Sequence, residues 1–140
     1  MIEIEHTAEY PQPATALFAV LADIEGYPAW QADVAQCHLD GPLRQGATVT
    51  QVRTVLGRRT EVELRVVRIE PERALVLSTG PHARPAVTQR YAVSDAGDGC
   101  RVTFRLELEG VPRMAEPLVR VQLGKQVPQL FLRLGELLTA

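Results

Sequence analysis

The stretch RVTFRLELEGVPRMAEPLVRVQLGKQVPQLFLRLGELLT, residues 101–139, changes its hydrophobic period at Gly110. Before this glycine, apolar and polar residues alternate as in a strand with one buried face, which carries Val102, Phe104, Leu106 and Leu108. After Pro112, apolar residues recur at intervals of three and four on one helical stripe: Leu123, Val127, Leu130, Phe131, Leu134 and Leu138. A one-faced strand followed by a one-faced helix predicts that this helix packs against a sheet.

Other segments of the chain also have strand character, and turn residues bound them. They are residues 2–10, 33–40, 47–56, 59–69, 74–79 and 86–94, and the strand described above covers 100–109. Most connections are short, which favours antiparallel pairing because parallel neighbours need a long crossover. The sequence therefore predicts an α+β fold, in which a curved antiparallel seven-stranded sheet is wrapped around a long C-terminal helix.

Two short helices are predicted after the first strand, and the C-terminal helix has an irregular point. Residues 14–21 place their apolar side chains on one helical face. Asp23 is expected to cap a second short helical turn, which the segment Gly26–Trp30 breaks. Pro128 removes a backbone hydrogen bond inside the last helix, so a kink is expected there. In residues 114–126 two apolar faces compete, and the phase of the helix stays open.

The composition indicates a globular chain without a nucleic-acid-binding surface. With 140 residues, of which 46% are hydrophobic and 23% charged, it has the size and composition of a single domain, placed at residues 1–140. Its net charge of −2 offers no basic surface for a phosphate backbone, so nucleic acid is not an expected partner. Its apolar runs are shorter than a bilayer span, so stable membrane insertion is not expected.

The sequence lacks the motifs of metal, nucleotide and nucleophile chemistry. His6, His38 and His82 lie far apart without metal-ligand spacing, and no GxSxG, P-loop or GxGxxG motif occurs. Cys37 and His38 are neighbours in a predicted strand, so their side chains point to opposite faces. No cofactor or metal is therefore expected. Cys37 and Cys100, without CxxC spacing or a secretory leader, predict buried thiols and a cytoplasmic location.

Short stretches of the chain resemble the START-like or SRPBCC superfamily, which includes proteins labelled polyketide cyclase/dehydrase-like. PATALFAVLAD at residues 13–23, followed by YPAW at 27–30, is similar to the opening of that family, and RQGA at 44–47 and GR at 57–58 are similar to later hairpins. The resemblance covers nearly the whole chain and implies a helix-grip fold with a ligand cavity between the concave sheet face and the last helix. Members include lipid carriers, coenzyme Q-binding proteins, hormone receptors and aromatase/cyclases, so the motifs specify fold better than activity.

Strand alternation predicts which side chains face this cavity. Gln89 and Tyr91 lie on the inward side of residues 86–94, and residues 59–69 turn inward Thr60, Val62, Leu64 and Val66. If Gly57 and Arg58 are the two central turn residues, Leu56 pairs with Arg59, Arg53 lies opposite Val62, and Gln51 lies opposite Leu64. Gln51 and Arg53 would then be inward as well. A few polar groups in an apolar chamber are the usual composition of a small-molecule site.

Each polar candidate also has a purely structural interpretation. A one-residue slip of the hairpin would put Gln51 and Arg53 in solvent. If Arg53 faces inward, burial of its charge requires a carboxylate or an anionic ligand beside it. Tyr91 and Gln89 are either ligand contacts or hydrogen-bonded core residues. Trp30 is interpreted first as a packing residue of the helical pair and second as a ligand contact.

These patterns and the resemblance together predict binding of a small hydrophobic molecule, such as a polyketide-like, isoprenoid or lipid compound. The predicted ligand-binding residues are Trp30, Gln51, Arg53, Val62, Leu64, Leu77, Gln89, Tyr91, Phe104, Leu106, Leu123 and Val127. The alternative is a polyketide aromatase/cyclase or dehydratase, in which Tyr91 or Arg53 assists enolisation or water loss. A protein-interaction module similar to the coenzyme Q-binding branch is a further alternative, and a homodimer remains open.

Overall fold

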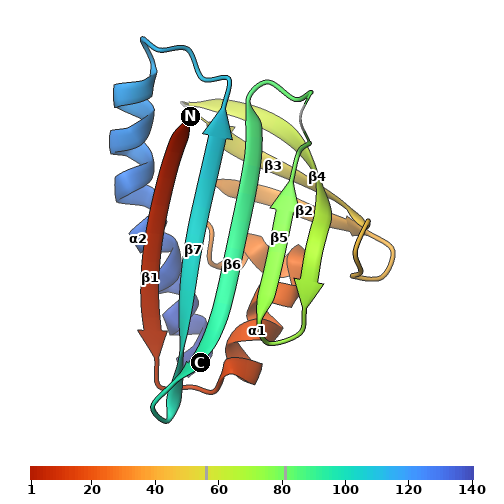
Figure 1. Cartoon of the computed structure of the whole chain (residues 1–140), viewed down its shortest axis with the longest axis vertical. Helices are drawn as coiled ribbons and strands as arrows, with labels where there is room; N and C mark the ends of the chain where they lie inside the picture. The colour runs from red at the N-terminus through yellow and green to blue at the C-terminus, as the bar shows by residue number, and fades with distance from the viewer. Residues whose placement is uncertain (56, 81) are drawn as a thin grey trace.

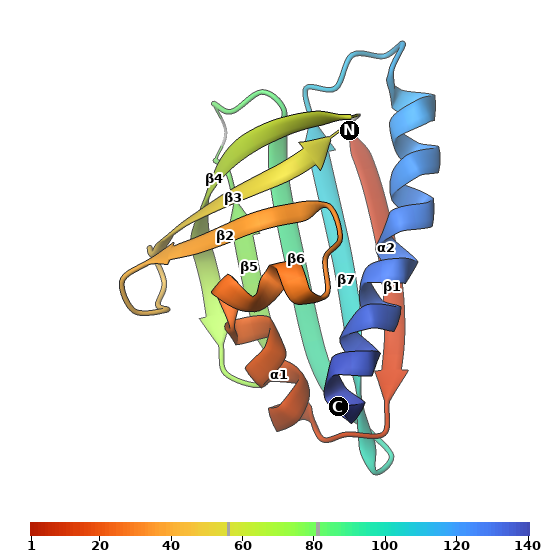
Figure 2. The same cartoon turned by 180° about the vertical axis from the view of Figure 1, so that it is seen from behind.

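The computed structural model describes residues 1–55, 57–80 and 82–140, and its strands form one antiparallel sheet. The elements follow one another as β1 (Ile2–Tyr10), α1 (Ala14–Ala22), the 3₁₀ helix η1 (Ile24–Ala29), β2 (Val34–Asp40), β3 (Thr48–Val55), β4 (Arg58–Glu70), β5 (Ala74–Ser78), β6 (Ala86–Ala96), β7 (Gly99–Glu109) and α2 (Glu116–Thr139). The strand order across the sheet is β1-β7-β6-β5-β4-β3-β2. The helices lie on the same side of the curved sheet, with α2 along β1 and β7 (Figures 1 and 2).

The sheet curves strongly between its two edges. Figure 2 shows β2 and β3 crossing the direction of β6 and β7 at a steep angle. Register shifts between Val34 and Gln36 in β2 and between Val66 and Arg68 in β4 interrupt the regular pairing. Irregularities of this kind bend a strand and increase its twist. The predicted seven-stranded sheet with a long closing helix is confirmed, and this is the helix-grip arrangement that the resemblance implies.

Helix α2 packs against β1 and forms one side-chain hydrogen bond with it. Its buried side chains are Val119, Val127, Phe131 and Leu134. The hydroxyl of Tyr10 donates a hydrogen bond to the carbonyl oxygen of Phe131 over 2.7 Å. A Cβ atom at Gly135 would lie 3.0 Å from Cε1 of Tyr10, so the small residue lets the ring approach. The helix continues through Pro128 without an interruption.

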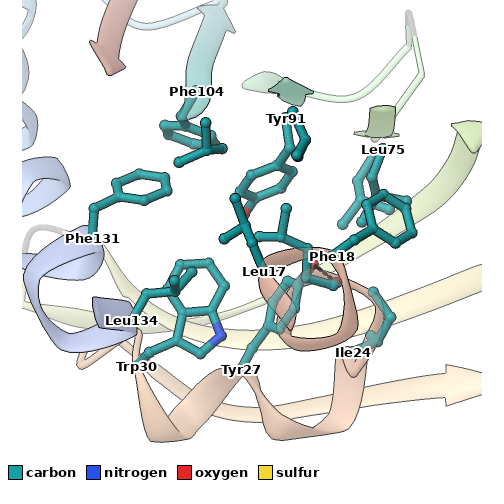
Figure 3. Packing of buried hydrophobic residues seen from close by; sticks show 14 of the residues in the cluster. Leu17, Phe18, Ile24, Tyr27, Trp30, Leu75, Tyr91, Phe104, Phe131 and Leu134 are labelled. Carbon is teal, nitrogen blue, oxygen red and sulfur yellow. Dashed lines mark hydrogen bonds between the residues drawn. The ribbon is translucent and has the colours of Figure 1, made fainter. Parts of the chain in front are cut away.

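Aromatic side chains fill the end of the concave face that α1, η1 and the C-terminal half of α2 cover (Figure 3). The ring centroids of Tyr91 and Phe104 are 4.9 Å apart, and those of Phe104 and Phe131 are 5.4 Å apart. Trp30 contacts Phe131 at 5.9 Å and Tyr27 at 5.1 Å. Tilted and edge-to-face rings at these distances are favourable and fill the core densely. Trp30 is 1% exposed, which agrees with its first interpretation as a packing residue.

The register predicted for the β3–β4 hairpin is wrong, but Gln51 and Arg53 lie on the predicted face of the sheet. Arg58 belongs to β4 and pairs with Val55, so it is not a central turn residue. Gln51 pairs with Val62, and Arg53 pairs with Thr60, two residues away from the predicted pairing. A shift of two residues preserves the face, because side chains alternate with a period of two. The predicted partner Leu56 lies outside the described residues, as does Pro81 of the predicted turn at 80–81.

The predicted second helical turn also needs correction. Gly26, Tyr27 and Pro28 do not break it, because η1 includes all three residues. Asp23 precedes η1 but makes no hydrogen bond from its side chain to the helix, so the predicted cap is wrong. The main chain closes the turn instead, since the N–H group of Gly26 donates to the carbonyl of Asp23 over 3.0 Å. Trp30 follows directly and points into the core.

Candidate functional site

A cluster of polar side chains lies on the concave face between β2, β3 and β6. Its members, which we call the polar cluster, are Gln31, Asp33, Gln51, Arg53, Gln89 and Tyr91. Arg53 is at the centre: Nη1 donates to Asp33 Oδ2 over 2.6 Å, Nη2 to Gln31 Oε1 over 2.7 Å, and Nε to Gln51 Oε1 over 2.8 Å. Two longer contacts of 3.4 Å join Gln89 Nε2 to Gln51 Oε1 and Gln31 Nε2 to the Tyr91 hydroxyl.

The segment between η1 and β2 brings two members of the polar cluster to Arg53. The N–H group of Gln31 donates to the carbonyl of Tyr27 over 2.8 Å, which fixes Gln31 at the end of η1. The N–H group of Thr54 donates to the carbonyl of Asp33 over 2.8 Å, and Val34 pairs with Arg53. The side chains of Arg53 and Asp33 are each only 15% exposed. The carboxylate predicted beside an inward Arg53 is therefore present as Asp33.

Several buried polar atoms of this region have no hydrogen-bond partner among the described residues: Trp30 Nε1, Asp33 Oδ1, Gln51 Nε2 and Gln89 Oε1. Gln51 is 0% exposed and Gln89 is 3% exposed. A buried polar atom without a partner costs free energy, and native proteins leave few of them unpaired. Four such atoms therefore leave unused hydrogen-bonding capacity around the polar cluster.

Burial keeps the ionisable hydroxyl and thiol groups near the polar cluster protonated. It raises the pKa of Tyr91 to about 12, against a smaller lowering by the nearby Arg53. It also raises the pKa of Tyr27 well above the ordinary value, and hydrogen bonding with Tyr91 contributes. The pKa of Cys37 rises to about 11 for the same main reason, although its contact with Gln51 acts in the opposite direction. At neutral pH none of these three groups is a ready proton acceptor.

The apolar residues of the concave face fall into two groups by burial. Those in contact with the aromatic core are buried, and among the predicted ligand-binding residues they include Leu64, Leu77, Phe104, Leu106 and Val127. A second set stays half-buried, although each member packs against the core from the inward side: Ile4, Val62, Val87, Leu108 and Leu123. The strand members lie near the first residues of β1, β4 and β6 and the last residues of β7, which form one end of the antiparallel sheet.

The hollows on the described part of the surface include two near the polar cluster and the strand ends. One has a volume of about 350 Å³ and lies between the η1–β2 segment and α2, lined by Ala32, Asp33, Lys125, Gln126, Gln129, Leu130 and Arg133. The other, of about 430 Å³, is lined by Met1, Ser78, Gly80, Ala86, Thr88, Arg90, Glu107 and Glu109. None of the twelve predicted ligand-binding residues lines either hollow. Asp33 joins the first hollow to the polar cluster.

The structure brings together the four polar residues predicted from strand alternation and adds to the polar cluster two residues that the sequence did not indicate. Gln51, Arg53, Gln89 and Tyr91 share the concave face, as alternation predicts. Gln31 and Asp33 were missed, because both lie in the segment between η1 and β2, where strand alternation does not indicate the direction of a side chain. The requirement for a carboxylate beside an inward Arg53 was the available sequence clue, and it did not say which acid supplies it.

Neither a candidate metal cluster nor a candidate membrane span is found in the described part of the chain. No group of three or more His, Cys, Asp or Glu side chains there is arranged to hold a metal ion. Within residues 1–55, 57–80 and 82–140, no helix combines the length and hydropathy needed to cross a bilayer.

Comparison with known proteins places the chain in a family. Residues 1–133 match the model of the family described as "Polyketide cyclase / dehydrase and lipid transport". A search of curated protein sequences finds no match to the chain. Among solved structures, the protein TTHA0849 from Thermus thermophilus is similar at 15% identity and a TM-score of 0.84, over 99% of this chain and 97% of that one.

Two further solved structures share the fold. A START superfamily protein from Mycobacterium smegmatis has 15% identity and a TM-score of 0.83, over 98% of this chain and 97% of that one. The major latex-like protein 151 from Panax ginseng has 11% identity and a TM-score of 0.75, over 96% and 95% of the two chains. Identities this low establish the fold alone. The family match over residues 1–133 shows that this chain belongs to the polyketide cyclase/dehydrase and lipid transport family, and the solved structures show that it shares their fold.

Proposed function

We propose that this protein binds a small hydrophobic molecule between the concave face of the sheet and α2. The proposal rests on the half-buried apolar set at one end of that face, which consists of Ile4, Val62, Val87, Leu108 and Leu123. These side chains point inward, yet solvent still reaches them, whereas the other end of the face is filled by aromatic rings. An apolar ligand would remove this remaining apolar surface from water, which is favourable at roughly 25 cal/mol per Å².

The polar cluster supports the same proposal, because apolar sites for small molecules carry a few precisely placed polar groups. Gln51 pairs with Val62, and Gln89 pairs with Leu106, so both amides lie beside the apolar end of the face. The family description, which includes lipid transport, agrees with an apolar ligand of the polyketide-like, isoprenoid or lipid type. We place the twelve ligand-binding residues predicted from the sequence in this site, with Trp30 mainly as support.

A cyclase or dehydratase reaction has less support from the polar cluster. Such a reaction needs a group that accepts or donates a proton near neutral pH. The pKa of Tyr91 is raised to about 12, and its hydroxyl already accepts a hydrogen bond from Gln31. Arg53 is engaged by three acceptors. Both groups suggested for catalysis from the sequence therefore have structural partners.

An interaction module that uses the outer face of the sheet also has less support. That face carries cross-strand ion pairs, including Arg101 with Glu9 at 2.8 Å and Arg90 with Glu107 at 2.8 Å. A docking face for a protein partner is normally depleted in charge at its centre. Val67, at 50% exposed, is a single apolar residue and does not form a patch.

The proposal is tested by filling the site from α2. Leu123→Trp places a large side chain against the half-buried apolar set, whereas Leu132→Trp makes the same change at a position of the helix that is 62% exposed. We expect Leu123→Trp to weaken binding of the neutral apolar dye Nile red about tenfold or more, which corresponds to about 1.4 kcal/mol. Leu132→Trp should bind as the original chain does.

Native mass spectrometry provides a second test that needs no chosen ligand. Protein purified from its own host should carry a co-purified small molecule, and the Leu123→Trp protein should carry less of it. If the dye binds equally to the original chain and to Leu123→Trp, and no small molecule co-purifies, the proposed function is wrong.

A further inference from the structure

Two buried glutamine amides form a matched pair of unused hydrogen-bonding groups. Gln51 on β3 and Gln89 on β6 come from strands that are not neighbours in the sheet, and the curvature brings their amides into contact at 3.4 Å. Gln51 Nε2 and Gln89 Oε1 have no partner among the described residues. Gln51 pairs with Cys37 across β2 and β3 and contacts its thiol, a weak acceptor that can take only one of the two N–H groups of Gln51 Nε2. One good donor and one good acceptor are thus left unused at adjacent positions.

The orientation of both amides follows from Arg53. A guanidinium group can only donate hydrogen bonds, so the atom of Gln51 that lies 2.8 Å from Arg53 Nε must be the oxygen. The same oxygen accepts the contact from Gln89, which must therefore present its nitrogen. Gln51 is left with a free N–H donor and Gln89 with a free carbonyl acceptor. This assignment does not depend on any bound molecule.

The charge of the polar cluster is already balanced. Asp33 pairs with Arg53 over 2.6 Å, so the one cation and the one anion of the cluster neutralise each other. An anionic ligand group would have to compete with Asp33 for the guanidinium and would approach its carboxylate. A cationic group would meet Arg53. Burying an unpaired charge is strongly unfavourable, whereas an uncharged polar group needs only hydrogen-bond partners.

We propose, on the basis of the proposed function, that the ligand is an uncharged apolar molecule whose polar end carries a hydroxyl group held by Gln51 and Gln89. The hydroxyl oxygen accepts a hydrogen bond from Gln51 Nε2, and its O–H group donates one to Gln89 Oε1. An alcohol or an enol has both capacities in one atom. The hydrocarbon part lies over the half-buried apolar set beside Val62 and Val87. No covalent step is involved.

The experiment compares three probes with the same hydrocarbon chain: decane, decan-1-ol and decanoate. Each probe competes with Nile red for the protein at a pH where decanoate is ionised. Gln51→Leu and Gln89→Leu keep approximate side-chain size but remove the amide. Gln36→Leu is the matched control, because Gln36 is exposed on β2 and pairs with Val52, on the other face of the sheet.

The original chain should bind decan-1-ol about tenfold more tightly than decanoate, a difference of about 1.4 kcal/mol. Gln51→Leu and Gln89→Leu should lower the affinity for decan-1-ol toward that for decane, and Gln36→Leu should leave it unchanged. Asp33→Asn removes the charge that balances Arg53, so this variant should gain affinity for decanoate. These shifts together would support the hydroxyl site.

A measurement on the original chain tests the hydroxyl site without any variant, so poor folding of a variant cannot affect it. In its nuclear magnetic resonance spectrum, the side-chain NH₂ signal of Gln51 should shift on addition of decan-1-ol and should not shift on addition of decane. Equal or tighter binding of decanoate, or an unchanged Gln51 signal with decan-1-ol bound, would overturn the hydroxyl site while leaving hydrophobic binding intact. If none of the probes displaces Nile red, the proposed function itself fails, and the hydroxyl site fails with it.

Discussion

Breaking the Arg53–Asp33 pair by removing one member should cost more free energy than removing both members. With each side chain 15% exposed, loss of one partner leaves a mostly buried charge. We expect Asp33→Leu and Arg53→Met each to lower the free energy of unfolding by about 3 kcal/mol, the lower end for buried pairs. The double variant removes both charges and leaves two amides, of Gln31 and Gln51, with weaker partners. At about 1 kcal/mol per lost hydrogen bond, it should cost only about 2 kcal/mol.

The assay is a double-mutant cycle measured by urea unfolding. Trp30 is the only tryptophan and is 1% exposed, so its fluorescence reports unfolding of the core. The expected coupling energy is about 4 kcal/mol, the difference between two single costs of about 3 and a double cost of about 2 kcal/mol. The exposed pair Arg101–Glu9, with side chains 47% and 59% exposed, is the control and should couple by less than about 1 kcal/mol. Additive costs in the Arg53–Asp33 cycle would refute a buried, neutralised pair.

Three other predictions concern α2 and the buried thiol of Cys37. Gly124→Ala should stabilise the protein by about 0.5 to 1 kcal/mol, because alanine favours a helix and its Cβ meets nothing within 4 Å. Gly135→Ala should gain less stability or lose some, because the new Cβ would lie 3.0 Å from the Tyr10 ring. Urea unfolding measures the free energy of unfolding of both variants. Equal gains in stability would contradict the close approach of Tyr10 to Gly135. Cys37 should react slowly with iodoacetamide. Its pKa of about 11, against an ordinary 9.0, lowers the thiolate population at neutral pH about a hundredfold. Labelling at the rate of a free thiol would show that solvent reaches the Cys37 thiol. The raised pKa of Cys37 also means that the unfolded chain releases its proton first, so the free energy of unfolding should fall as the pH rises from 9.0 to about 11, by up to about 3 kcal/mol. Cys37→Ala should lose less stability over that interval, and an identical pH dependence in both proteins would disprove the shift.

The fold was predictable because alternation and helical periodicity are local properties. Val102, Phe104, Leu106 and Leu108 alternate over a whole strand, and this pattern identifies the inward face without any knowledge of its neighbours. The face of Gln51 and Arg53 was predicted from an assumed turn at the wrong position, and the error of two residues happened to preserve it. An error of one residue would have reversed the site.

The partners within the polar cluster were not predictable, because they depend on contacts between distant parts of the chain. Asp33 reaches Arg53 from the segment before β2, which the N–H group of Thr54 holds against β3, and no residue type in that segment predicts this contact. Gln31 was not distinguished from other glutamines, because its position depends on how η1 ends. The unpaired atoms of Gln51 and Gln89 became visible only with the orientation of both amides. Whether an apolar face is filled or left half-buried likewise requires side-chain packing, which the pattern of residue types does not contain.

The unequal filling of the concave face has a consequence for how such proteins diverge. The aromatic end, with Trp30, Tyr91, Phe104 and Phe131, is densely packed, so substitutions there are costly. At the half-buried end, the proposed function predicts that changes at Val62 or Leu123 alter which molecule fits at a smaller cost in stability. On that proposal, mutational tolerance is concentrated in the ligand site. The proposed function thus allows a lineage to exchange one apolar ligand for another while its scaffold persists.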